Sequence, residues 1–555
     1  MNRKILFVIV PTFPYAKFIS PGENEIYDVT KNGKKTRMFV GGIPIGVLSI
    51  SSYVKKYSEN TEIKIIDFNL IINGLVKNSE IDKYNSFREL YVDIMEQYSN
   101  YKPDIVAISA IFNSSFECIQ ECAEIIRKKF EETRIIVGGG LATNAYKMLL
   151  ANIPTIDAAC VGEGEVPFAN LAKSDDIDEA LEKQEAFFTR NKMENNILVN
   201  ANFVKNLDDI PPFDYGLISF DEYAEDSHYG NVMSKNKISR VLNICSTRGC
   251  PHKCTFCCSH SVHGRTIRYH SAERIIADIQ FAINRLKIDT ITFNDDNFLY
   301  DRERALCILK YLSDKNLNVT FPNGFTIYRI DDEISEALSA AGVKEAALAL
   351  ESGNQNTLDN IIKKPLKLEM VKPAIESLRK AGLYVRGFFM IGFPGETKES
   401  IKDSIDYLCQ LEFNWVMVYT VTPFLGSEIY EICKENNYLL KNSELQLFYE
   451  CTIETPDFDA SYISREAYLT NLKVNFVNNY DMKVGNYELA LMRFEKIISQ
   501  AKDHAVAYYC AAFCANKLGD IEKGSAYKTE ILRIVEKSDL WNDYIKDLKL
   551  DINSI

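Results

Sequence analysis

The chain has 555 residues, 46% of them hydrophobic, which is enough for about three domains with large cores. A formal net charge of −13 and a pI near 5.2 argue against a nucleic-acid-binding surface as its main function. No segment approaches the ~18 uninterrupted apolar residues of a membrane helix, and no signal-peptide pattern is present. Fourteen cysteines in such a chain indicate reduced thiols and a metal site.

Residues 1–200 alternate apolar strands with amphipathic helices, which predicts a Rossmann-like, doubly wound parallel sheet. Ligands of such sheets bind at the carboxyl ends of the strands. Ser109 and the turn Gly138–Gly140 fall at two of these ends. We expect strands at 5–10, 62–67, 104–110, 134–137 and 156–161, and helices at 44–57, at 118–130 and from 143 onward.

Residues 201–239 are predicted to be a linker, because Pro211, Pro212 and neighbouring acidic residues favour an extended chain. From 240 to 450, strands and helices repeat with the spacing of a partial (β/α)6 TIM-type barrel. Polar residues follow several of its strands, where barrel enzymes keep their chemistry. We expect strands at 240–246, 290–294, 346–350, 384–391 and 415–421, and helices at 274–286 and 367–381.

Three cysteines follow the first barrel strand at the spacing C-x3-C-x2-C: Cys250, Cys254 and Cys257. Such a loop can place three thiolates around one face of a 4Fe–4S cluster, which normally takes four thiolates. With no obvious local fourth ligand, one iron would stay open. Zinc is an alternative because His252, His260 and His263 are near, although zinc cysteines usually come in C-x2–4-C pairs. A disulfide framework is a poorer alternative, since so large a chain needs none.

The order of motifs resembles the radical S-adenosylmethionine (SAM) superfamily: the cysteine triad, Asp295-Asp296, Glu351-Ser352-Gly353 and Gly392-Phe393-Pro394-Gly395-Glu396. The resemblance covers about residues 5–440. It implies that Cys250, Cys254 and Cys257 hold a 4Fe–4S cluster whose open iron chelates SAM. It also implies that the reduced cluster cleaves SAM to a 5′-deoxyadenosyl radical.

The same resemblance implies roles for the polar residues at the strand ends. Phe256 would contact the adenine of SAM. Asp296, or as second choice Asp295, would contact its ammonium group. Glu351 and Ser352 would contact its ribose, and Arg386 its carboxylate or ribose.

The first 200 residues resemble the cobalamin-binding domain that precedes the barrel in one class of this superfamily, the group of class B methyltransferases and anaerobic Mg-protoporphyrin cyclases. The resemblance rests on Ser109-Ala110-Ile111, Gly138-Gly139 and Val161-Gly162-Glu163-Gly164-Glu165. The Asp-x-His-x-x-Gly motif is absent and no histidine precedes His228, so no histidine of this domain can ligate cobalt. The alternative is a domain that kept the fold and lost cobalamin.

Residues 451–555 are predicted to be helical. The segments 485–494 and 505–518 resemble one tetratricopeptide-type hairpin. A single unit cannot bury a solenoid core, so it either caps the barrel or offers a groove to a partner protein.

The sequence therefore predicts a cytoplasmic radical SAM enzyme that methylates an unactivated carbon with the help of cobalamin. Its substrate would be a small molecule, lipid or peptide, and its electron donor a flavodoxin or ferredoxin. One alternative is a radical SAM cyclase, oxidase or carbon–carbon bond-forming enzyme with a cobalamin-free scaffold domain. Another is a cobalamin- or metal-binding protein with an inactive barrel.

Overall fold

The apolar runs near the N-terminus form a six-stranded sheet of order β4–β1–β5–β6–β7–β8. All neighbouring strands are parallel except β7 and β8, which are antiparallel. This confirms the Rossmann-like sheet. Its strands are β1 (Arg3–Ile9), β4 (Thr61–Asp67), β5 (Ile105–Ser109), β6 (Arg134–Gly138), β7 (Ala158–Cys160) and β8 (Phe187–Thr189).

The computed structural model describes residues 3–20, 27–29, 35–37, 39, 42–226, 239–440 and 451–555. Parts of the expected linker (227–238) and of the expected boundary after the barrel (441–450) therefore lie outside the described residues.

Helices cover both faces of the sheet because successive strand residues point to opposite sides. In β1, Leu6 and Val8 face one hydrophobic cluster, and Ile5 and Phe7 face another. The first face is covered by α3 (Phe68–Lys77), α4 (Phe87–Gln97), α5 (Phe116–Lys129) and α6 (Gly140–Asn152), and the second by α2 (Ile45–Tyr57), α7 (Glu165–Lys173) and α8 (Ile177–Lys183).

The strand order places a crevice at one edge of this sheet. Strands β4, β1, β5, β6 and β7 follow the flavodoxin-like pattern, in which the connections from the first strand diverge. Ligands of such sheets bind where that divergence occurs, beyond the carboxyl ends of β1 and β5. These ends are Ile9 and Ser109, which are paired in the sheet.

The second region is a parallel barrel made of two three-stranded sheets, β13–β12–β9 and β14–β15–β16. Parallel bridges between Val319 and Val343 and between Phe325 and Leu348 join the sheets. This confirms the partial (β/α)6 barrel. Its strands are β9 (Val241–Ile244), β12 (Thr290–Phe293), β13 (Asn318–Thr320), β14 (Glu345–Glu351), β15 (Tyr384–Ile391) and β16 (Trp415–Thr420).

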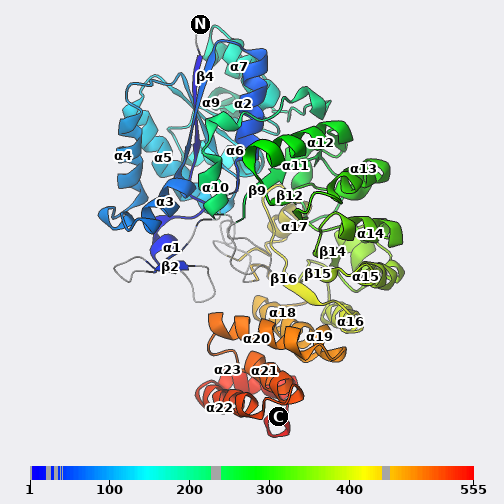
Figure 1. Cartoon of the computed structure of the whole chain (residues 1–555). Coiled ribbons are helices and arrows are strands. Elements are labelled where there is room, and N and C mark those ends of the chain that lie inside the picture. Colours follow the sequence, from blue (N-terminus) through cyan, green and yellow to red (C-terminus); the bar gives the residue numbers. More distant parts are fainter. Residues whose placement is uncertain are drawn as a thin grey trace.

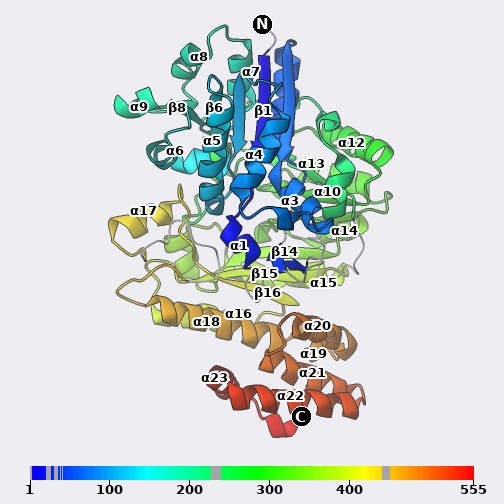
Figure 2. The ribbon, with the colours of Figure 1, turned by 90° about the vertical axis from the view of Figure 1, so that its left-hand side faces the viewer.

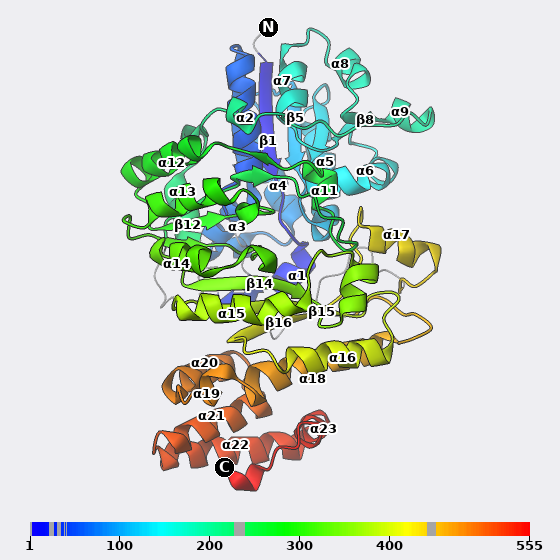
Figure 3. The same cartoon turned by 90° about the vertical axis from the view of Figure 1, so that its right-hand side faces the viewer.

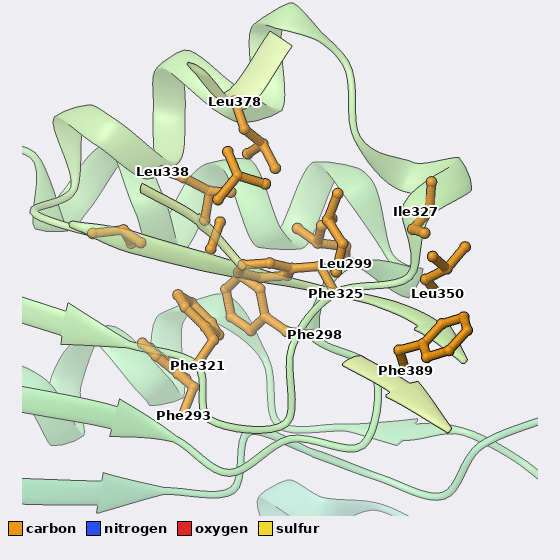
Figure 4. Packing of buried hydrophobic residues seen from close by; sticks show 14 of the residues in the cluster. Phe293, Phe298, Leu299, Phe321, Phe325, Ile327, Leu338, Leu350, Leu378 and Phe389 are labelled. Atoms are coloured by element: carbon orange, nitrogen blue, oxygen red, sulfur yellow. The ribbon is translucent and has the colours of Figure 1, made fainter. Parts of the chain in front are cut away.

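Helices pack on the outside of the barrel strands (Figure 3). They are α12 (Ala272–Phe281), α13 (Arg302–Leu312), α14 (Asp332–Ala340), α15 (Val371–Lys380), α16 (Lys398–Leu408) and α17 (Glu428–Glu435). Figure 4 shows Phe293, Phe298 and Phe321 in the layer beneath helical residues such as Leu338. The Phe293 and Phe321 rings stack with centroids 5.0 Å apart. This layer fixes the strands and hence the loops at their carboxyl ends.

The C-terminal helices have a hydrophobic core of their own. They are α18 (Ala460–Leu472), α19 (Tyr480–Lys483), α20 (Tyr487–Gln500), α21 (Ala505–Lys517), α22 (Ile521–Lys537) and α23 (Asp539–Asp547). Helix α21 contacts both α20 and α22, so the expected hairpin is present with one further helix beside it.

The helical region is attached to the barrel at its last strand. Asn475 accepts a hydrogen bond from the Val416 amide and donates one to the Val416 carbonyl, both at 2.7 Å, and so completes the edge of β16. Helix α18 runs below β15 and β16 (Figure 2), and the chain termini lie at opposite ends of the molecule (Figure 1). Among the described residues, no helix is both long and apolar enough to cross a bilayer.

Candidate functional site at the interface of sheet and barrel

The cysteine loop (residues 249–258) lies between β10 (Thr247–Arg248) and α11 (Ser259–His263). Its first residue must be glycine, because Gly249 has φ +88° and an added Cβ would lie 2.5 Å from the Thr266 carbonyl oxygen. The strand β10 pairs with β11 (Arg268–Tyr269), so both ends of this segment are held together. The segment is a closed loop at the mouth of the barrel.

Thr255 fixes the middle of the cysteine loop to the barrel. Its amide donates to the Ile362 carbonyl at 3.0 Å, and its hydroxyl donates to the Ile361 carbonyl at 2.9 Å. Its carbonyl accepts from the Ile429 amide at 3.0 Å. Next to it, Phe256 packs edge-on against Phe393, with ring centroids 6.1 Å apart. The predicted adenine contact therefore lies beside the Gly392–Glu396 turn.

The environment of the three cysteines suits a cationic cluster. Burial raises the pKa of all three thiols, that of Cys257 to about 12. Thiolates at these positions therefore need a cationic partner, and the irons of a cluster supply one. Lys364 adds positive charge nearby: burial would lower its pKa, but the charges of Glu351 and Cys254 raise it.

The spacing of the three cysteines also distinguishes a cluster from zinc. Zinc sites usually pair their cysteines as C-x2–4-C with a second Cys or His pair some way off, whereas C-x3-C-x2-C can bring three thiolates to separate irons of one cube. The spacing therefore favours the cluster.

Two neighbouring carboxylates hold the cysteine loop in place. Asp296 accepts hydrogen bonds from the Gly249 amide at 3.1 Å and the Ser259 hydroxyl at 2.6 Å, and so joins the two ends of the loop. Asp295 accepts from the Ser246 hydroxyl at 2.6 Å and is 4% exposed. Burial raises the pKa of Asp295. Its position supports the loop, and the SAM contact stays a prediction for both Asp296 and Asp295.

Glu351 ends β14 (Glu345–Glu351) and Ser352 follows it, and both residues are buried. Glu351 has φ +66° and pairs with the Lys364 ammonium at 3.2 Å, close to the cysteine loop. Ser352 is fully buried, and its hydroxyl shares a 2.6 Å hydrogen bond with the Ser404 hydroxyl on α16. Ser352 therefore fastens a helix to the barrel, and the ribose contacts of Glu351 and Ser352 stay predictions.

Arg386 lies apart from the other predicted SAM contacts. It pairs with Glu345 at 3.2 Å, and Glu345 is the first residue of β14. In the register of β15 it stands opposite Ala347 and Trp415, near the amino ends of their strands. The cysteine loop lies at the carboxyl ends of the barrel strands, so Arg386 stands apart from it, and its SAM contact stays a prediction.

Glu396, the last residue of the Gly392–Glu396 motif, is a buried acid to which the sequence alone assigned no role. One of its oxygens accepts from the Gly392 and Phe393 amides, both at 2.9 Å. Its other oxygen is buried without a hydrogen-bond partner in the described structure. Burial raises its pKa to about 7. Glu396 thus closes the turn beside Phe256.

A cavity of about 490 Å³ lies between the carboxyl edge of the sheet and the barrel mouth. Ser109, Gly138 and Gly139 line it together, as their predicted roles require. Gly139 has φ +108°, and an added Cβ would lie 2.6 Å from the Ala110 carbonyl oxygen. This close backbone cradle, at the crevice that the strand order defines, fits a nucleotide-like tail. The barrel contributes Asn243, Arg248, Val262, His263 and Asn294 to the lining.

The acidic turn of the sheet domain joins this cavity to the cysteine loop, an interaction the sequence analysis missed. Arg248 pairs with Glu165 at 2.8 Å and with Glu163 at 3.5 Å. Burial opposes ionisation of Glu163, but hydrogen bonds from His263 and Arg268 and the charge of Arg248 hold its pKa below the usual range. The sequence features that could have indicated this interaction are the two acids of the turn and the arginine directly before Gly249.

Comparisons with known proteins agree with this arrangement. The radical SAM superfamily matches residues 244–408, and the B12 binding domain matches residues 40–172. Cytidylyl-2-hydroxyethylphosphonate methyltransferase of Streptomyces wedmorensis is 25% identical over 426 residues, covering 71% of this chain and 78% of the relative.

An anaerobic magnesium-protoporphyrin IX monomethyl ester cyclase of Cereibacter sphaeroides is 26% identical over 343 residues, covering 60% of this chain and 53% of the relative. The solved structure of the cobalamin-dependent SAM radical enzyme OxsB with aqua-cobalamin shares the fold. Its TM-score is 0.59 at 14% identity, covering 100% of this chain and 81% of OxsB.

Proposed function

We propose that this chain, which matches the radical SAM superfamily over residues 244–408 and the B12 binding domain over residues 40–172, methylates an unactivated carbon with cobalamin as methyl carrier. One observation carries the proposal: the cavity of the sheet domain is lined in part by barrel residues, and one of them, Arg248, directly precedes the cysteine loop. A methylase of this kind needs both cofactors at one site, and this interface supplies it.

When bound, the cluster and SAM supply a radical that removes hydrogen from carbon, and cobalamin supplies the methyl group. The protein's own residues bind and orient these groups. Cys250, Cys254 and Cys257 hold the cluster, and Lys364 adds positive charge beside it. The hydrogen bonds of Thr255 fix the loop against the barrel.

The remaining contacts extend this proposal. Phe256, Asp296 and Glu351 surround the space beside the cysteine loop and are suited to the adenine, ammonium and ribose of SAM. On the other side of the interface, Ser109, Gly138 and Gly139 are suited to the nucleotide tail of cobalamin.

We infer that the low-potential electron comes from a flavodoxin or ferredoxin. Lys253 and Arg265 are exposed at the cysteine loop, where Arg265 donates to the His252 carbonyl at 2.7 Å, and both would attract an acidic donor. Reduced thiolates favour a cytoplasmic location. The substrate is a small molecule, lipid or peptide, and α20–α22 are a candidate surface for a partner protein.

Anaerobically purified protein loaded with iron, sulfide and cobalamin provides the test. Incubation with SAM labelled with deuterium in its methyl group should transfer that label to a candidate substrate and release 5′-deoxyadenosine. Release of 5′-deoxyadenosine without any methylated product, across extracts of candidate substrates, would contradict methyl transfer.

The similarity to the cyclase favours a second candidate function. In it, the same radical starts ring closure or oxidation, and the sheet domain serves as a scaffold. Ultraviolet–visible spectra separate the two: protein that never binds cobalamin yet cleaves SAM would support the second candidate.

A further inference from the structure

Glu163 lies at the centre of the interface between the two cofactor sites. It is 5% exposed and accepts hydrogen bonds from the Val204 amide at 2.8 Å and from His263 Nδ1 at 3.2 Å. Arg268 binds both of its oxygens, at 2.8 and 2.9 Å. Arg248 approaches to 3.5 Å. One buried carboxylate of the sheet domain thus meets donors from three segments of the chain.

These donors flank the cysteines. Arg248 comes just before Cys250, whereas His263 and Arg268 come after Cys257. A second link closes the same segment, since Arg268 also donates to the His263 carbonyl at 2.6 Å. Glu163 therefore holds both ends of the segment that carries the three thiols.

The same residue belongs to the wall of the cavity. Residues 162–165 line it, and the two glycines of this turn leave no room for a side chain. An added Cβ on Gly162 would lie 2.7 Å from the Ala201 Cβ, and one on Gly164 would lie 2.7 Å from the Ile50 Cδ1. A molecule that fills the cavity and contacts this turn must therefore also restrict Glu163.

We propose that Glu163 is a positioning residue that couples the two sites, so that cobalamin and SAM each bind more tightly when the other is present. The inference rests on the proposed function, because it takes cobalamin as the occupant of the cavity. Both ligands favour the state in which the turn and the cysteine loop are docked together. Linkage then requires the effect to be reciprocal.

The test uses full-length protein with an oxidised cluster, so that SAM binds without being cleaved. Equilibrium dialysis with radiolabelled SAM, with and without hydroxocobalamin, gives the ratio of the two dissociation constants. We expect cobalamin to tighten SAM binding about tenfold in the native protein, a common size for coupling between sites. In Glu163→Gln, which keeps the shape but loses the charge, the ratio should fall below about twofold.

Asp208→Asn is the matched control. Asp208 lies at the same interface and accepts from the Ser271 amide at 3.0 Å and from His270 at 3.2 Å, and both of these partners lie beyond the segment between Arg248 and Arg268. Its ratio should stay near that of the native protein. This comparison separates coupling through Glu163 from a general loosening of the interface.

Arg268→Lys is a milder second variant if Glu163→Gln does not fold. It keeps the charge but loses the two-pronged contact, and we expect a ratio of about threefold. The coupling would be overturned if Glu163→Gln and Arg268→Lys gave the same ratio as the native protein, or if the native ratio were one. Either result would leave the proposed function standing. Native protein that bound no SAM at all would overturn both.

Discussion

Replacing Glu396 by glutamine should remove a pH-dependent loss of stability. The carboxyl group is buried, and its pKa is raised from 4.5 to about 7. Between these pH values the folded protein binds more protons than the unfolded chain, so the free energy of unfolding falls as pH rises. A shift of this size corresponds to about 3 kcal/mol, lost between pH 4.5 and pH 7.

Glutamine stays neutral and still accepts from the Gly392 and Phe393 amides, so Glu396→Gln should not lose this stability. The assay is urea unfolding of both proteins, metal-free and anaerobic, from pH 5 to pH 8. The variant should gain about 3 kcal/mol relative to the native protein over that range. Glu399→Gln, an exposed acid in the first turn of α16, is the control and should show no such gain. A difference between Glu396→Gln and native protein that stays flat from pH 5 to pH 8 would refute the reasoning.

Three further predictions test the site. Gly139→Ala forces a Cβ against the Ala110 carbonyl at a residue with positive φ. The affinity for cobalamin, measured by spectral titration, should therefore fall at least about tenfold. Unchanged affinity would contradict the proposal that this backbone binds the nucleotide tail. Thr255→Val loses the hydroxyl hydrogen bond to the Ile361 carbonyl, so the reconstituted variant should hold less iron and sulfide than the native protein. Equal iron and sulfide content would show that this hydrogen bond is not needed to hold the loop. Arg386→Met should leave the dissociation constant of SAM within about twofold of the native value, because Arg386 lies away from the cysteine loop; a tenfold weaker constant would restore the role first expected of it.

Much of the architecture was predictable because apolar runs and their spacing determine strands and helices locally. The strand Tyr384–Ile391 was expected at the bounds that the structure shows. The cysteine loop and the glycines at the sheet edge were predictable for a different reason. Cluster ligands must be cysteines at a suitable spacing, and close approach of two backbone segments requires glycine, so both features are visible in the sequence.

The sequence could not show which tertiary contacts the predicted side chains make. Alternation along β15 indicates which face Arg386 occupies, but its distance from the cysteine loop depends on the end of the barrel at which it pairs with Glu345. Ser352 and Asp295 follow strands, as ligand-binding residues do, yet Ser404 and Ser246 occupy their polar atoms. Such partners are remote in sequence, and no local pattern identifies them.

The contacts of Glu163 were missed for the same reason. Its partners Arg248 and Arg268 belong to another domain, and only the folded interface brings them together. The turn that contains Glu163 was recognisable as a motif, but its function as a link between the cavity and the cysteine loop required the structure.

Reductive cleavage of SAM tests the central claim most directly. Reconstituted protein should hold four irons per cluster. The electron paramagnetic resonance spectrum of the reduced protein should change when SAM is added. With dithionite as reductant, the protein should then release 5′-deoxyadenosine. Alanine at Cys250, Cys254 or Cys257 should abolish all three observations. The account would be contradicted if the protein held zinc. It would also be contradicted if the spectrum of its cluster did not change on addition of SAM and no 5′-deoxyadenosine was released.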